Sequence, residues 1–171
     1  MIKKPMNKSQ AGFTLIEVLL ALVLGVIVMD LAFNFYSQGQ MIYTKTQNQV
    51  DAQSQLRLEM NQIKRQLGVA TNVEISDAPG SYEVGFFYFY VNSNTMVIKD
   101  GTSLPKALPG CLPLPGLEVF FSKSPHQVNL VRVHMISAEG VELNSDILTQ
   151  NTGAIVGDTT ERTTIKFKRI N

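Results

Sequence analysis

The chain has 171 residues, a formal net charge of +1 and 44% hydrophobic residues. This length allows one modest hydrophobic core beside any membrane segment, so we expect one globular domain. The near-neutral charge gives no strong basic field to attract nucleic acid by counterion release, which argues against DNA binding as the main task. Cys111 is the only cysteine, so no disulfide can form within the chain.

An apolar run from residue 13 to residue 35 follows a short basic leader. The run is long enough to cross a hydrocarbon core of about 30 Å, which takes about 20 helical residues. The residues after Met29 offer no cleavage site of the secretory type, so we expect the helix to stay in the membrane. Lys3, Lys4 and Lys8 precede the run without an acidic residue, and the positive-inside rule places the amino end in the cytoplasm.

Two carboxylates interrupt the apolar run. Glu17 lies near its start and Asp30 near its far end. An unpaired carboxylate at the centre of a bilayer costs roughly 2.5–3.5 kcal/mol on insertion scales, so Glu17 needs a cationic partner or access to the headgroups, toward which its side chain can snorkel. A charge is cheaper at the depth of Asp30, for which a water-exposed helix end and a pairing role both stay open.

The string GFTLIEVLLAL at residues 12–22 resembles the cleavage and methylation signal of type IV pilins and type II secretion pseudopilins. The resemblance implies that a prepilin peptidase cuts after Gly12 and methylates the amino group of Phe13. It also implies that Glu17, the fifth residue after the cut, sets the assembly register by meeting the amino terminus of a neighbouring subunit. Together with the long glutamine-rich continuation, the string is most similar to the PilW and pseudopilin J group of minor pilins.

This resemblance also implies where the protein acts and what it meets. The expected protein is a structural subunit and not an enzyme, with a single-pass helix in the cytoplasmic membrane and a later place in an extracytoplasmic pilus or pseudopilus. The expected partners are other pilins or pseudopilins, the prepilin peptidase and the inner-membrane assembly platform; no cofactor, metal or catalytic residue is expected. The apolar residues assigned to the membrane and assembly helix are Phe13, Leu15, Ile16, Val18, Leu19, Leu20, Leu22 and Leu24.

The helix is expected to continue well beyond the membrane. No proline lies between Pro5 and Pro79, so we predict one helix from about residue 13 to about residue 67, roughly 80 Å long at 1.5 Å per residue. Arg57, Glu59 and Lys64 show no pairing pattern and are interpreted as solvated surface charges. Four apolar residues recur at helical spacing and are predicted to pack on the head: Leu56, Met60, Ile63 and Leu67.

The remaining sequence changes to the period of strands, and the expected fold class is α+β, a long N-terminal helix packed on an antiparallel β-sheet head. Residues 82–91 and 95–99 predict a hairpin, and further strands are expected at 117–122, 128–136 and 163–170. Irregular connectors are expected at 104–116, which contains four prolines, and at 143–162. The predicted division of the chain is a leader at 1–12, a membrane helix at 13–36, the outer half of the helix at 37–68 and the head at 69–171.

Few residues of the head suggest chemistry. Cys111 has no activating neighbour in the sequence. His126 and His134 lack the spacing of a zinc site. A calcium site formed by three oxygen donors from the last third of the sequence is a weak alternative, since the spacing of these residues is not specific to calcium binding. These donors are Asn144, Asp146 and Asp158.

Two other functions stay open at this stage. Lys166, Lys168 and Arg169 form a basic cluster on the last predicted strand, which a DNA-binding competence pilus subunit would use, although a solvated edge that discourages strand pairing explains it better. A signal-anchored envelope protein with a ligand-binding β-domain is the second alternative. It would keep its amino terminus at Met1 or Met6.

Overall fold

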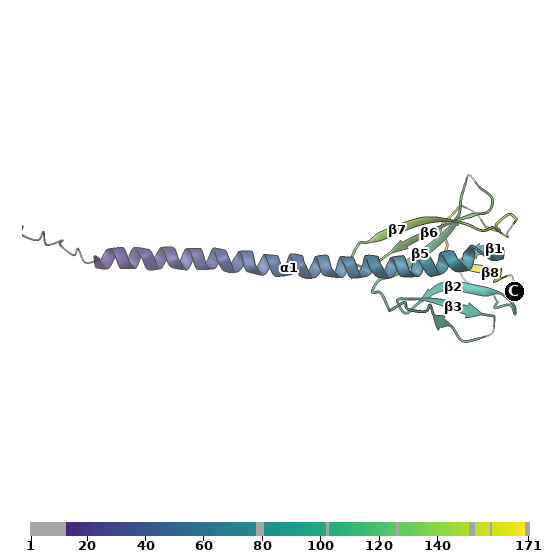
Figure 1. Cartoon of the computed structure of the whole chain (residues 1–171), viewed down its shortest axis with the longest axis horizontal. Helices are drawn as coiled ribbons and strands as arrows, with labels where there is room; N and C mark the ends of the chain where they lie inside the picture. Colours follow the sequence, from purple (N-terminus) through teal and green to yellow (C-terminus); the bar gives the residue numbers. More distant parts are fainter. Residues whose placement is uncertain are drawn as a thin grey trace, which may run out of the picture. The chain divides into compact units, whose positions relative to one another are not determined.

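One long helix precedes eight strands in the described part of the computed structural model (Figure 1). Contacts divide the chain into a unit that ends at Lys45 and a unit that begins at Thr46. Leader residues 1–12, among them the predicted cleavage residue Gly12, lie outside the described residues. The structure describes residues 13–77, 81–101, 103–125, 127–150, 153–157 and 159–169.

Helix α1 spans Leu15–Leu67, which confirms the prediction of one continuous helix. Proline is absent from this stretch, so no residue removes a backbone donor or forces a kink. The helix ends where Gly68 follows, and the Gly68 N–H still donates to the Lys64 carbonyl at 2.9 Å. Lys64 and Arg65 lie in the last turn, where positive charge is favourable beside the exposed carbonyls.

The larger sheet has five antiparallel strands in the order β1-β8-β2-β3-β4. The predicted hairpin is confirmed as β2 and β3, joined by Ser93 and Asn94 with φ of 48° and 61°. Two successive left-handed residues form the type I′ turn that matches the twist of paired strands. The strands of this sheet are β1 (Ala70–Ser76), β2 (Phe87–Asn92), β3 (Thr95–Asp100), β4 (Lys106–Ala107) and β8 (Thr164–Arg169).

The smaller sheet has three antiparallel strands, β5 (Glu118–Lys123), β6 (Leu130–Ile136) and β7 (Glu142–Leu148). Strand β7 falls in the segment that the sequence analysis assigns to an irregular connector, and that prediction is wrong. Asn and Asp are depleted in strands, but β7 pairs with β6 along its whole length, from Leu130 opposite Leu148 to Ile136 opposite Glu142. This long-range pairing overrides the local preference.

The outer turns of α1 pack in one core with both sheets. The predicted face of the helix is confirmed, because Leu56, Ile63 and Leu67 have no exposed surface and Met60 is 3% exposed. The residues of β2 and β8 in this core include an aromatic group, in which the Phe167 ring lies 5.0 Å from that of Phe89. Inward-facing residues of β5, β6 and β7 complete the core: Val119, Phe121, Val131, Val133, Met135 and Ile147.

Gly116 allows a close approach between the loop before β5 and the turn after β6. Its φ is 62°, and a Cβ built there would lie 2.7 Å from the Ala138 Cβ and 3.1 Å from the Ala138 backbone. We expect Gly116→Ala to lower the free energy of unfolding by about 3 kcal/mol, from left-handed strain and from displaced backbone. Denaturant unfolding of the chain in detergent micelles measures this change.

Gly140 provides the matched control. Its φ is 72°, but a Cβ there would meet nothing within 4 Å. Gly140→Ala should therefore cost only the strain, about 1 kcal/mol. Equal losses in the two variants would contradict the steric account of Gly116.

Candidate functional site

Thr14 and Glu17 form a reciprocal pair at the start of α1. The Thr14 backbone N–H donates to Glu17 Oε2 at 3.5 Å, and the Glu17 backbone N–H donates to Thr14 Oγ1 at 3.4 Å. This is a capping box, which satisfies donors that the first turn of a helix leaves unpaired. A carboxylate is also favourable beside the positive end of the helix dipole. The sequence analysis gave Thr14 no role, although a threonine three residues before a glutamate and an apolar run is a readable capping signal.

The first half of α1 exposes its apolar side chains. The eight residues predicted to form the membrane helix are between 50% and 84% exposed, the extremes being Val18 and Leu15. None of the residues in the most apolar window of the helix is buried within the chain, and its mean hydropathy is 2.6. By length and composition α1 is able to cross a membrane. So large an apolar surface needs lipid or other helices around it, and α1 therefore acts as a single membrane anchor.

Asp30 contacts its own helix. Asn34, one turn later, donates from Nδ2 to Asp30 Oδ2 at 3.4 Å, and both side chains are exposed. The described residues contain no cation within ion-pairing distance of Asp30. Both interpretations of this residue therefore stay predictions.

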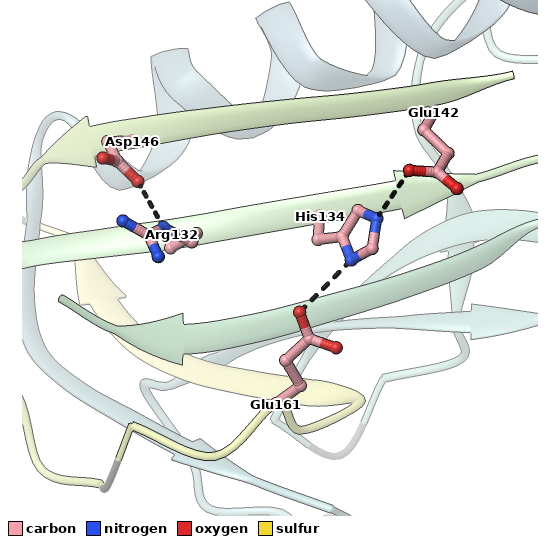
Figure 2. Close-up of polar contacts among 5 residues, drawn as sticks. All are labelled: Arg132, His134, Glu142, Asp146 and Glu161. Atoms are coloured by element: carbon pink, nitrogen blue, oxygen red, sulfur yellow. Dashed lines mark hydrogen bonds and ion pairs between the residues drawn. The ribbon is translucent and has the colours of Figure 1, made fainter.

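A group of polar side chains lies on the three-stranded sheet (Figure 2). His134 lies between two carboxylates, with Nδ1 3.2 Å from Glu161 Oε1 and Nε2 3.8 Å from Glu142 Oε2. Arg132 donates from Nε to Asp146 Oδ1 at 3.0 Å, because the register of β6 and β7 places these two residues opposite each other. The Asp146 carboxylate raises the pKa of Arg132, so this guanidinium stays charged.

The geometry of this polar group does not suit a metal ion. Glu142 and Glu161 face different nitrogens of the imidazole, so their oxygens do not converge on one point with a single nitrogen (Figure 2). No cluster of His, Cys, Asp and Glu in the described ranges is arranged to hold a metal. The proposed calcium donors Asn144 and Asp146 lie on strand β7 and not in a loop, which removes the basis for that alternative. His126 and Asp158 lie outside the described residues.

An open hollow of about 450 Å³ is lined by residues of β2, β5 and β8. Burial, followed by a hydrogen bond with Tyr82, raises the pKa of Tyr90 to about 12, so the Tyr90 phenol is neutral at physiological pH. Lys99 Nζ lies 3.1 Å from the centroid of the Tyr82 ring, which fixes that ring from one side. The hollow is lined by Asp77, Tyr82, Tyr90, Val91, Leu117, Glu118, Val119, Phe120, Thr163 and Thr164.

The basic cluster near the carboxyl end is not the strand edge that the sequence predicts. Strand β8 lies between β1 and β2, so its residues protect no free edge, and that interpretation is wrong. Lys166 Nζ forms ion pairs with Glu83 at 2.7 Å and with Glu74 at 3.3 Å, and these partners raise its pKa. The Arg169 guanidinium lies 4.1 Å from the centroid of the Phe87 ring. Two of the three cations are therefore engaged within the head, which weakens the case for DNA binding.

Comparison with protein families matches residues 7–29 to the prokaryotic N-terminal methylation motif. Comparison with curated proteins gave no match. Among solved structures, the chain is similar to the PilB minor pilin from Streptococcus sanguinis, with 15% sequence identity and a TM-score of 0.45. That similarity covers 71% of this chain and 35% of the other, so this chain spans about a third of the length of that protein. The methylation motif lies at the start of the long apolar helix, where the sequence resembles the cleavage signal of type IV pilins.

Proposed function

We propose that the protein is a minor pilin or pseudopilin, a structural subunit and not an enzyme. The observation that supports this proposal is the methylation motif at residues 7–29, followed directly by a helix whose apolar side chains are exposed. The helix α1 first anchors the subunit in the cytoplasmic membrane, with the basic leader in the cytoplasm. It then exchanges lipid for the helices of other pilins or pseudopilins in a filament outside the cytoplasm.

The prepilin peptidase would cut after Gly12 and methylate Phe13. Glycine before the cut presents a backbone without a side chain to hinder the protease. Cleavage frees an α-amino group that is positively charged below about pH 8. This amino group is the cation that Glu17 of a neighbouring subunit needs when both are surrounded by apolar helices.

The capping box leaves room for such a partner. The Thr14 backbone N–H donates to Oε2 of Glu17, while Oε1 of Glu17 accepts no hydrogen bond among the described residues. The carboxylate can therefore cap the N-terminus of its own helix and, at the same time, accept a hydrogen bond from a neighbour's amino group. Glu17 would then place each incoming subunit relative to the one before it.

The amino terminus of the membrane-extracted protein tests this proposal. We expect mass spectrometry to find a chain that begins at N-methylated Phe13 in cells with the prepilin peptidase and an uncut chain in cells without it. A chain that begins at Met1 or Met6 in peptidase-positive cells would contradict the proposal and support a signal-anchored envelope protein. In that case the hollow between β2 and β5 becomes the first place to look for a ligand.

The assembly that the subunit joins, whether a pilus, a secretion system or a competence system, is a more detailed prediction. Assembly through an inner-membrane platform, a priming position at the filament tip and similarity to the PilW and pseudopilin J group all stay predictions. DNA uptake stays an alternative for which we expect no binding by the protein in detergent at low salt, where counterion release favours binding most. Salt-sensitive binding that is lost when Lys168 is neutralised would instead favour a competence pilus.

A further inference from the structure

Glu59 is a carboxylic acid buried in the core of the head. Its side chain has no exposed surface, and neither carboxylate oxygen has a hydrogen-bond partner among the described residues. The prediction that Glu59 is a solvated surface charge is therefore wrong. Glu59 follows Ala52 and Leu56 and precedes Ile63 at spacings of four, three and four, which places it in the apolar stripe of α1.

The proline-rich segment, residues 104–116, covers Glu59. Gln55 and Gln62 lie one turn to either side of Glu59 on the same face of α1. Gln55 Nε2 donates to the Leu112 carbonyl at 3.2 Å, and Gln62 Nε2 donates to the Pro109 carbonyl at 3.5 Å. Cys111 lies in the chain between these two carbonyls and is only 8% exposed. The two glutamines therefore hold the proline-rich segment across the helix with Glu59 beneath it.

Within the described ranges, no cation forms an ion pair with Glu59. Cys111 is its titratable neighbour in the proline-rich segment, and burial together with the charge of Glu59 raises the pKa of that thiol to about 11. Lys106, the cation of the segment, is exposed on β4. The hollow beside Gln55 and Leu112 is lined by Asp51 and Glu139, which are both acidic.

Strands of both sheets contribute apolar side chains to the core that contains the outer turns of α1. Phe89 of β2, Met96 of β3 and Val119 of β5 belong to the same buried cluster as the outer turns of α1. Burial consequently raises the pKa of Glu59 from 4.5 to about 7. Gln55 lowers this pKa a little, but its amide is bonded to the Leu112 carbonyl and makes no hydrogen bond with the carboxylate.

We propose that protonated Glu59 allows the proline-rich segment to dock on α1, and that ionisation of Glu59 releases the segment and exposes Cys111. An ionised carboxylate needs water, and water reaches it only when the segment lifts from the helix. Because the pKa is raised in the docked state, docking is most favourable at acidic pH and is lost as the pH rises through about 7. A pKa of about 7 in place of 4.5 corresponds to a change of up to about 300-fold in the docking equilibrium.

The accessibility of the Cys111 thiol reports the release of the proline-rich segment. We would measure the rate at which N-ethylmaleimide modifies Cys111 in the full chain in detergent micelles, for the wild-type protein and for Glu59→Gln. The ratio of the two rates at each pH removes the intrinsic pH dependence of the thiol. We expect the ratio to be near one at about pH 4, below the ordinary pKa of the Glu59 carboxyl, and to exceed about ten at about pH 9.

Hydrogen exchange at the same pH values separates local release from unfolding. We expect faster exchange in peptides of the proline-rich segment while the amides of β6 stay protected. If Glu59→Gln does not fold, Glu59→Met serves as the comparison, since it too cannot ionise and keeps a similar volume. A rate ratio that stays constant with pH, or simultaneous loss of protection in β6, would overturn the proposal.

Discussion

Glu17→Gln is expected to reduce incorporation of the subunit into filaments by more than about tenfold while leaving cleavage intact. Glutamine keeps the capping box with Thr14, because an amide oxygen accepts the Thr14 N–H as a carboxylate does. It removes the charge, however, and in the proposed filament would leave the neighbour's amino group without a partner among apolar helices. Removing one partner of a buried ion pair costs about 3–5 kcal/mol, which exceeds a hundredfold in an equilibrium constant. Immunoblots of sheared filaments and of the membrane pool measure incorporation.

Thr14→Ala is the matched control for this experiment. The substitution removes the Thr14 Oγ1 that accepts the Glu17 N–H and leaves the carboxylate charged. It should cost the helix start about 1 kcal/mol and should reduce incorporation much less than Glu17→Gln does. If Thr14→Ala abolished incorporation and Glu17→Gln did not, Glu17 would act through the helix cap and not through a neighbour's amino group. Mass spectrometry of the amino terminus checks that both variants are still cut.

Phe167→Ala is expected to destabilise the head by about 3–5 kcal/mol, a large share of the stability of a domain of this size. Phe167 has no exposed surface and lies beside Phe87 and Phe89, with ring centroids 5.8 Å and 5.0 Å away. Truncation would leave a cavity between two rings on strand β2, which the paired backbones of β2 and β8 cannot close. Denaturant unfolding in detergent micelles, followed by circular dichroism, measures the loss.

Lys168 is the comparison for Phe167, since it is the next residue of β8 and is exposed. Lys168→Ala should change the free energy of unfolding by less than about 0.5 kcal/mol. A change below about 1 kcal/mol for Phe167→Ala would show that the core between β2 and β8 repacks around the missing ring.

Local signals predicted the helix and the first hairpin. The absence of proline predicted that α1 runs to Leu67, and the run of aromatic and β-branched residues before Asn92 predicted β2 and its turn into β3. Strands β1 and β7 escaped prediction because their stability comes from pairing with distant segments, β1 with β8 and β7 with β6. The central position of β8 depends on the same pairings, so the sequence could not show that Lys166 lies between two acidic strands.

Among the residues of interest, some are indicated by local sequence signals, and others depend on distant parts of the fold. The roles of Phe13 and Glu17 stay predictions, which rest on fixed offsets along one helix within the matched motif. The role of Thr14 was readable from the same offsets and was missed. Glu59 lies at a core spacing in α1, but nothing in the sequence shows that residues 109–112 fold over it.

The order of the strands governs when the head can form during synthesis. Strand β8 is made after every strand that it joins, yet it separates β1 from β2 and provides the bonds that hold them in one sheet. Until residues 164–169 have been synthesised, β1 lacks its neighbour, and closing so long a loop is slow. The apolar helix is translated well before that point, so the whole of α1 is available before the head can fold.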